Sequence, residues 1–312
     1  PTTISEKMCP IVPISCINSG MKPPKESVRQ KQGLGRLSRP ENTVSKQETI
    51  EGRLLWVDIV RTVACSAVVV FHVASPIVAG SPAPSGTLWW TASVTAGFAS
   101  LCVPLFVLIS GALLIPRAET EPSRAFYRKR CRFAVPVVFW TAVYMGVRLL
   151  SGEKPGSFAL ALDVVRGIPY YHLWYLYILP GLYFVTPILV RYTRLRPRKY
   201  RFALLMLIMT ASSAASLLVD LLTDKDYHTI FTRFLPFIGF YLAGHELAIT
   251  PPRHISRRVM IPVAVAAALS IPVSCRFIWL RIGKEEAQLL YHSLSPPVIL
   301  LAGSFFLLIR SA

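Results

Sequence analysis

Three ionisable residues, Asp58, Arg61 and His72, lie within the first long apolar segment of this chain, residues 54–77. An α-helix turns by about 100° per residue, so the steps of three and eleven residues between them place all three side chains on one stripe. A charged side chain at mid-membrane costs about 2.5–3.5 kcal/mol, and such residues usually pair and face protein or water. The stripe predicts a polar functional site. The alternative is an interfacial Asp58–Arg61 pair with His72 as a packing residue.

His72 is the residue of this stripe best suited to chemistry. A neutral imidazole accepts a proton from an attacking hydroxyl near neutral pH, or is itself acylated. Arg61 carries a permanent charge that can hold an anion, and Asp58 lowers the cost of keeping that charge inside a bundle. Cys65 lies on the same stripe, but a buried cysteine is most often a small hydrophobic residue, and we do not expect it to be a nucleophile.

The composition indicates which elements position these residues. The chain is 53% hydrophobic, with a mean hydropathy of +0.49, and carries repeated apolar runs long enough to cross a bilayer. We therefore predict an all-α, polytopic transmembrane helical bundle of about eight spans. The expected spans are 54–77, 88–115, 133–150, 172–190, 202–222, 230–249, 258–280 and 291–309.

The charge distribution predicts the orientation of the bundle. Loops 117–132, 191–201 and 250–258 hold fifteen Lys and Arg residues, whereas the alternating loops hold six, balanced by six acidic residues. Cytoplasmic loops are enriched in basic residues, so both termini are expected in the cytoplasm. The net charge of +18 follows from this topology, and no nucleic-acid partner is expected.

Residues 1–53 are polar and lack a sustained apolar period, so we expect a disordered basic cytoplasmic tail before a membrane domain at 54–312. The tail lacks the apolar core of a secretory signal. The six cysteines show no metal-ligand spacing, so neither a metal site nor a disulfide framework is predicted.

Several motifs then follow one another in a familiar order. The run "LLWVDIVRTVACSAVVVFHVASPIV", in which ten residues separate Arg61 from His72, resembles the opening motif of the acyltransferase-3 family, especially its surface-polysaccharide O-acetyltransferases. "VPLFVLISGALLI", "FYRKRCRFAVPVVFW", "HLWYLYILPGLYFVTPIL" and "FIGFYLAGHELA" resemble its later helix motifs. The family commonly has about ten spanning helices, two more than expected here, which suggests a truncated copy or a short subgroup.

The resemblance implies transfer of an acetyl group from cytoplasmic acetyl-CoA, as co-substrate, to a hydroxyl of a surface or lipid-linked glycan in the bacterial inner membrane. It implies catalytic or positioning roles for His72, Arg61 and Asp58. The implied donor-binding residues are Arg128, Lys129, Arg132 and Ser110, because clustered cations suit phosphate groups. No bound cofactor is expected. A transporter or export component for a small anion or glycan is the alternative.

Near the expected outer face, the candidate acceptor-binding residues are His172, Trp174, Arg233 and Arg276. Aromatic rings and polar donors suit a sugar, although Trp and Tyr also form interfacial belts and arginines also reach the interface from within a span. His245 and Glu246, at the expected inner end of the sixth span, are predicted to be solvated.

Overall fold

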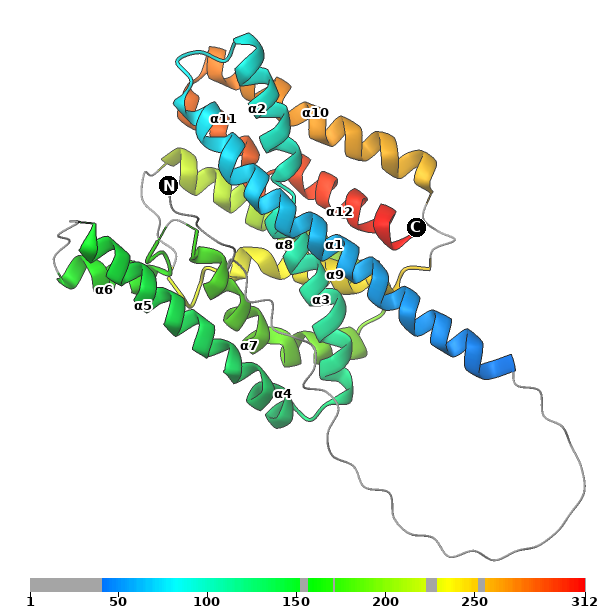
Figure 1. Ribbon diagram of the computed structural model, residues 1–312. Coiled ribbons are helices and arrows are strands. Elements are labelled where there is room, and N and C mark those ends of the chain that lie inside the picture. The colour runs from blue at the N-terminus through cyan, green and yellow to red at the C-terminus, as the bar shows by residue number, and fades with distance from the viewer. Residues whose placement is uncertain (1–40, 152–156, 171, 223–228, 252–255, 312) are drawn as a thin grey trace, which may run out of the picture. The chain divides into compact units, whose positions relative to one another are not determined.

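A computed structural model describes residues 41–151, 157–170, 172–222, 229–251 and 256–311. In these residues the secondary structure is helical and no strand occurs, and residues 47–312 form one compact unit (Figure 1). The predicted all-α class is confirmed. The longer helices are α1 (Glu41–Gly80), α2 (Gly86–Ala99), α3 (Cys102–Thr120), α4 (Ser123–Arg130), α5 (Ala134–Leu150), α6 (Ser157–Arg166), α7 (Trp174–Leu195), α8 (Arg198–Leu222), α9 (Ile238–Ile249), α10 (Arg257–Arg281), α11 (Lys284–Gln288) and α12 (Pro296–Arg310).

Seven helical segments in the described part of the chain are long and apolar enough to cross a membrane. This confirms a polytopic helical membrane protein. The segments are Leu55–Gly80, Gly86–Thr120, Ser123–Leu150, Trp174–Leu195, Arg198–Val219, Arg257–Arg281 and Lys284–Arg310.

The span expected at 230–249 is shorter than predicted. Its apolar helix covers only Leu235–Ile249, and residues 229–234 form turns in which Thr232 N and Arg233 N both donate to Thr229 O. Pro236 lies in the first turn of this helix and has no N–H to continue a helix upstream. The predicted eight spans are therefore seven long helices and one short one.

The first helix begins earlier than expected. Helix α1 starts at Glu41, so residues 41–53 continue the helix where the sequence predicted a disordered tail. Residues 41–51 contain no Pro or Gly and include Glu, Lys and Gln, which all favour a helix. Residues 1–40 of the expected tail lie outside the described residues.

The expected span 88–115 is broken in two. Helix α2 ends at Ala99 and α3 begins at Cys102, with Ser100 N donating to Ala96 O and Ser100 Oγ donating to Gly97 O. Pro104, in the first turn of α3, clashes with a continuous helix because its ring meets the carbonyl four residues before it. Pro104 therefore favours the start of α3 at this point, although α2 and α3 together still form one segment of membrane length, Gly86–Thr120.

The short helix α9 lies in the interior of the compact unit. Eight consecutive residues, 239–246, are buried, so every face of the helix is covered. It crosses α3 very closely: a Cβ on Gly111 would lie 1.8 Å from Tyr241 O, and a Cβ on Gly244 would lie 1.9 Å from Leu108 O. Glycine at both positions lets the two backbones meet, as small residues do between membrane helices.

Candidate active site

Helix α1 packs against the bundle through one face and leaves the polar stripe outside it. The packed residues are small or β-branched and are fully or nearly fully buried: Val57, Val60, Ala64, Ala67, Ala74 and Val78. The stripe lies about 130° around the helix from this face, because each residue adds about 100°. Asp58, Arg61, Cys65 and His72 are accordingly exposed, so the stripe is accessible to a ligand.

Asp58 and Arg61 form the predicted pair. Arg61 Nη1 lies 3.6 Å from Asp58 Oδ1, with 45% and 59% of the two side chains exposed. An ion pair this exposed contributes little stability. Its guanidinium can therefore turn to another anion at small cost, which is the property that a donor-positioning arginine needs.

The two predicted site histidines influence each other electrostatically. His72, on the exposed stripe, lies close enough to His172, just before α7, to affect its pKa. One hundred residues separate His72 from His172 in the sequence. The fold thus brings the predicted catalytic histidine together with one predicted acceptor residue.

His172 is half-buried among aromatic rings. Its ring centroid lies 4.6 Å from that of Tyr144, on α5, and 5.2 Å from that of Tyr170, in edge-to-face contacts, and the two tyrosine rings stack at 4.8 Å. Burial, and then the nearby His72, lower the pKa of His172 from its ordinary value. The imidazole is consequently neutral at pH 7, when it can both accept and donate a hydrogen bond.

The other predicted acceptor residues have structural partners. Trp174 packs against Phe237, with centroids 5.8 Å apart. Arg233 is buried, and its Nε donates to Arg166 O at 2.9 Å, beside Gly167, whose φ of +71° requires a glycine.

Arg276 joins α10 to the segment before α2. Its Nη1 donates to Pro84 O, and its guanidinium lies 5.7 Å from the centre of the Trp90 ring. These contacts hold the segment before α2 in place whether or not the arginine also reaches a ligand.

A basic rim follows the end of α3, consisting of Arg124, Arg128, Lys129, Arg130 and Arg132. Glu121 neutralises part of it, because Lys129 Nζ lies 2.8 Å and Arg130 Nη1 3.7 Å from its carboxylate. The hydrogen bond from Lys129 lowers the pKa of Glu121, which therefore stays ionised at neutral pH. Arg128 and Arg132 are exposed, and no carboxylate of the described residues pairs with either. Of the rim residues, these two arginines are therefore open to an anion from outside the protein.

Residues 54–312 match a family model described as an acyltransferase domain, acyltransferase-3. This chain belongs to that acyltransferase family. No match was found among curated proteins or among solved structures. The family match covers α1 from its first apolar residues through α12, so the stripe, the rim and the short helix α9 all lie within the acyltransferase domain.

Ser110, predicted to bind the donor, is engaged within its own helix. Its Oγ donates to Phe106 O at 2.8 Å, one residue before the glycine at the crossing of α3 and α9. In this acyltransferase the Ser-Gly pair therefore has a clear packing function, through Gly111.

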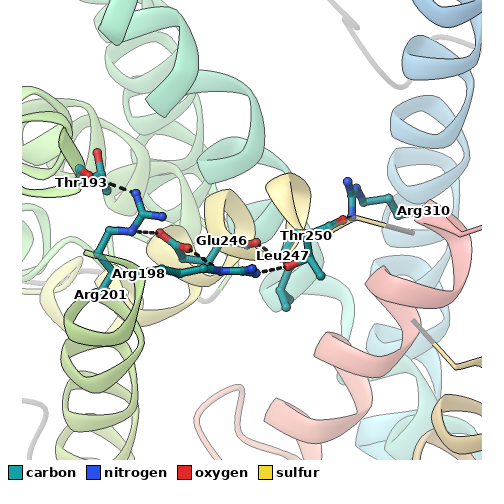
Figure 2. Close-up of polar contacts among 7 residues, drawn as sticks. All are labelled: Thr193, Arg198, Arg201, Glu246, Leu247, Thr250 and Arg310. Carbon is teal, nitrogen blue, oxygen red and sulfur yellow. Dashed lines mark hydrogen bonds and ion pairs between the residues drawn. The ribbon is translucent and has the colours of Figure 1, made fainter. Parts of the chain in front are cut away.

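A buried ionic cluster at the end of α9 was missed by the sequence analysis. The prediction that His245 and Glu246 are solvated is wrong, because their exposed fractions are 4% and 0%. Figure 2 shows the Glu246 carboxylate held between Arg201 and Arg198, with N···O distances of 2.9 and 3.8 Å. Arg201 also donates to Thr193 O at 3.0 Å, and Arg198 to Thr250 Oγ1 at 2.7 Å. The cluster joins α7, α8 and α9 at the basic end of the domain.

Arg310 extends this connection to the last helix. Its Nη1 donates to Leu247 O at 2.8 Å and also to Thr250 O, so it covers carbonyls that have no partner inside α9 (Figure 2). One feature of the sequence could have indicated the burial of Glu246. It is a charged residue in an apolar segment, and such a residue is usually paired with an opposite charge. The sequence alone did not identify its partners on α8, nor the contact of Arg310 on α12 with the end of α9.

Proposed function

We propose that this membrane acyltransferase is an O-acetyltransferase of the bacterial inner membrane, which transfers an acetyl group from cytoplasmic acetyl-CoA to a hydroxyl of a surface or lipid-linked glycan. The observation that supports this most strongly is the exposed stripe of α1, on which Asp58, Arg61 and His72 lie within the acyltransferase domain. A proton-accepting imidazole on an accessible stripe, opposite a neutral imidazole among aromatic rings, suits transfer to a sugar hydroxyl.

The donor is proposed to lie along the exposed stripe of α1. The eleven-residue step from Arg61 to His72 spans about 16 Å of helix, since each residue rises 1.5 Å. An extended acyl-CoA can then place its phosphates near Arg128 and Arg132 at the basic rim and its thioester at His72. Arg61 lies between these ends, where its charge can hold the donor in register.

The chemical step needs one base and no further reactant. His72 accepts the hydroxyl proton as the acceptor oxygen attacks the thioester carbon, forming the new C–O bond. The C–S bond then breaks, and the departing thiolate of CoA takes the proton from the imidazolium. In the alternative, His72 carries the acetyl group as an acyl-imidazole and the hydroxyl attacks that intermediate. His172 then serves as the base for the second transfer.

The test is acetyl transfer by the purified protein in lipid nanodiscs, with acetyl-CoA labelled in the acetyl group, and mass analysis of surface glycans from cells with and without the protein. We expect release of CoA and label on glycan hydroxyls. Two results together would contradict the proposal. One is that surface glycans carry the same acetyl groups in cells with and without the protein, and the other is that the purified protein releases no CoA.

A further inference from the structure

A cavity lies beside the second half of α1, beyond His72. Its volume is about 160 Å³, and its walls come from α1, α2 and the segment around α11. Figure 1 shows α2 and α11 next to this end of α1. The lining residues that matter here are Phe71, Ser75, Ala96, Gln288, Tyr291 and His292.

The cavity adjoins the predicted catalytic histidine. The Phe71 ring lines it and contacts the His72 ring edge to face, with centroids 6.1 Å apart. Ser75 follows His72 by three residues and so lies about one turn further along α1 on the neighbouring face. Residues on both sides of His72 in the sequence, Phe71 and Ser75, therefore line the cavity, although His72 itself does not.

Two polar groups on the cavity wall are not used by the protein. Several helical Ser and Thr hydroxyls of this domain donate to a carbonyl one turn earlier, as Ser110 does to Phe106 O at 2.8 Å. Among the described residues, neither the Ser75 hydroxyl nor the Gln288 amide has a hydrogen-bond partner, although both border the cavity. Partly buried polar groups of this kind are usually satisfied by water or a ligand.

A fixed wall completes the cavity. Tyr291 is buried, and its hydroxyl lies 2.5 Å from Ser93 Oγ, so the ring is held against α2. His292, the next residue, is exposed and marks the side on which the cavity meets its surroundings.

We propose that this cavity is the acceptor subsite and holds a sugar ring whose hydroxyl points to His72. This inference rests on the proposed function. A volume of about 160 Å³ is roughly ten times the ~10–15 Å³ that a single water molecule needs on this measure, which leaves room for a group larger than acetyl, such as one monosaccharide ring. The flat faces of Phe71 and Tyr291 suit the apolar face of a pyranose, while Ser75, Gln288 and His292 suit its hydroxyls. An apolar acyl chain would leave the Ser75 hydroxyl and the Gln288 amide unsatisfied.

The test is protection of an introduced thiol in the full-length protein in nanodiscs. Ser75→Cys is treated with a small thiol reagent in the presence of methyl glucoside, methyl galactoside, methyl N-acetylglucosaminide, coenzyme A or acetyl-CoA, and labelling of that peptide is followed by mass spectrometry. At least one methyl glycoside is expected to slow labelling, and coenzyme A is not. The matched control is Ser270→Cys on α10, a half-buried position whose native hydroxyl bonds Ala267 O at 2.8 Å, where no glycoside should alter labelling.

Turnover with the protecting glycoside gives a second measurement. Ser75→Ala and Gln288→Ala should each raise the KM for that glycoside by about 2–10-fold, the loss of one hydrogen bond, without raising the KM for acetyl-CoA. Protection by acetyl-CoA but by no glycoside, or by none of the five compounds, overturns the subsite. A change confined to the KM for acetyl-CoA overturns it too. Wild-type protein that releases no CoA from acetyl-CoA would instead contradict the proposed function, whatever the labelling shows.

Discussion

At the residue scale, the proposed chemistry of this acyltransferase rests on two imidazoles that come from distant parts of the chain. His72 lies on the exposed stripe of α1, and His172 is half-buried against Tyr144 and Tyr170. Each environment suits a different task. The accessible imidazole can meet a thioester, while the enclosed one stays neutral and can orient a hydroxyl.

The first prediction concerns the protonation of His172. Because burial and His72 both lower its pKa, half of His172 should be protonated only below pH 6.5, its ordinary value. Replacing His72 by Gln removes the neighbouring positive charge and should move this midpoint upward. Carbethoxylation of neutral imidazole, followed at the His172 peptide by mass spectrometry against pH, measures both. An unchanged or lower midpoint in His72→Gln would show that the two rings do not interact.

The second prediction concerns the buried carboxylate of Glu246. Glu246→Leu leaves Arg201 without its partner in a site where that side chain is only 15% exposed, so we expect a loss of about 3–5 kcal/mol in the free energy of unfolding. The double variant Glu246→Leu with Arg201→Met removes both charges and should recover part of this loss. Thermal unfolding in detergent compares the three proteins. Equal stability of the single variant and wild type would mean that the pair is not buried.

At the element scale, the crossing of α3 and α9 holds the centre of the domain together. Gly111 on α3 lies against the backbone of α9, and Gly244 on α9 lies against the backbone of α3. A Cβ added at either position would collide with backbone atoms and not with a flexible side chain. A backbone cannot move aside alone, so the helices would have to separate. Residues 239–246 of the short helix α9 are buried on every face, so its neighbours must pack closely around it.

The third prediction tests this crossing. Gly244→Ala should destabilise the protein by about 1–3 kcal/mol, the usual cost of overpacking. The matched control is Gly146→Ala on α5, where nothing lies within 4 Å of an added Cβ, and which should be neutral or stabilise by up to about 1 kcal/mol. Thermal unfolding measures both variants. A similar stability for the two would place α9 further from α3 than the structure has it.

The fourth prediction belongs to the segment formed by α4 and α5. Arg128→Ala combined with Arg132→Ala should raise the KM for acetyl-CoA and leave that for the acceptor unchanged, because a phosphate contact made equally in ground and transition states changes uniform binding. The matched control, Arg191→Ala with Arg196→Ala, removes the same charge from two exposed positions, one in the last turns of α7 and one just after it. If the two double variants change the KM for acetyl-CoA equally, the basic rim does not bind the donor and serves only to orient the protein in the membrane.

At the scale of the whole molecule, the sequence predicted what depends on local pattern. Apolar runs of membrane length predicted the class and most spans, and helical periodicity placed Asp58, Arg61 and His72 on one stripe. The sequence-based prediction failed where contacts between distant segments determine the structure. The short α9 depends on α3 covering it, and the burial of Glu246 depends on arginines of α8, more than forty residues earlier. Neither is encoded in the periodicity of α9 itself. The orientation of the termini stays a prediction.

The most direct measurement of the central claim is acetyl transfer by the His72→Ala protein, purified in nanodiscs beside wild type and Arg61→Ala. We expect the turnover of His72→Ala to fall by about 10²–10⁴-fold, the usual loss for a general base, with CoA binding and thermal stability preserved. Arg61→Ala should chiefly raise the KM for acetyl-CoA. Wild-type turnover in His72→Ala would contradict the account and leave His72 as a packing residue of α1.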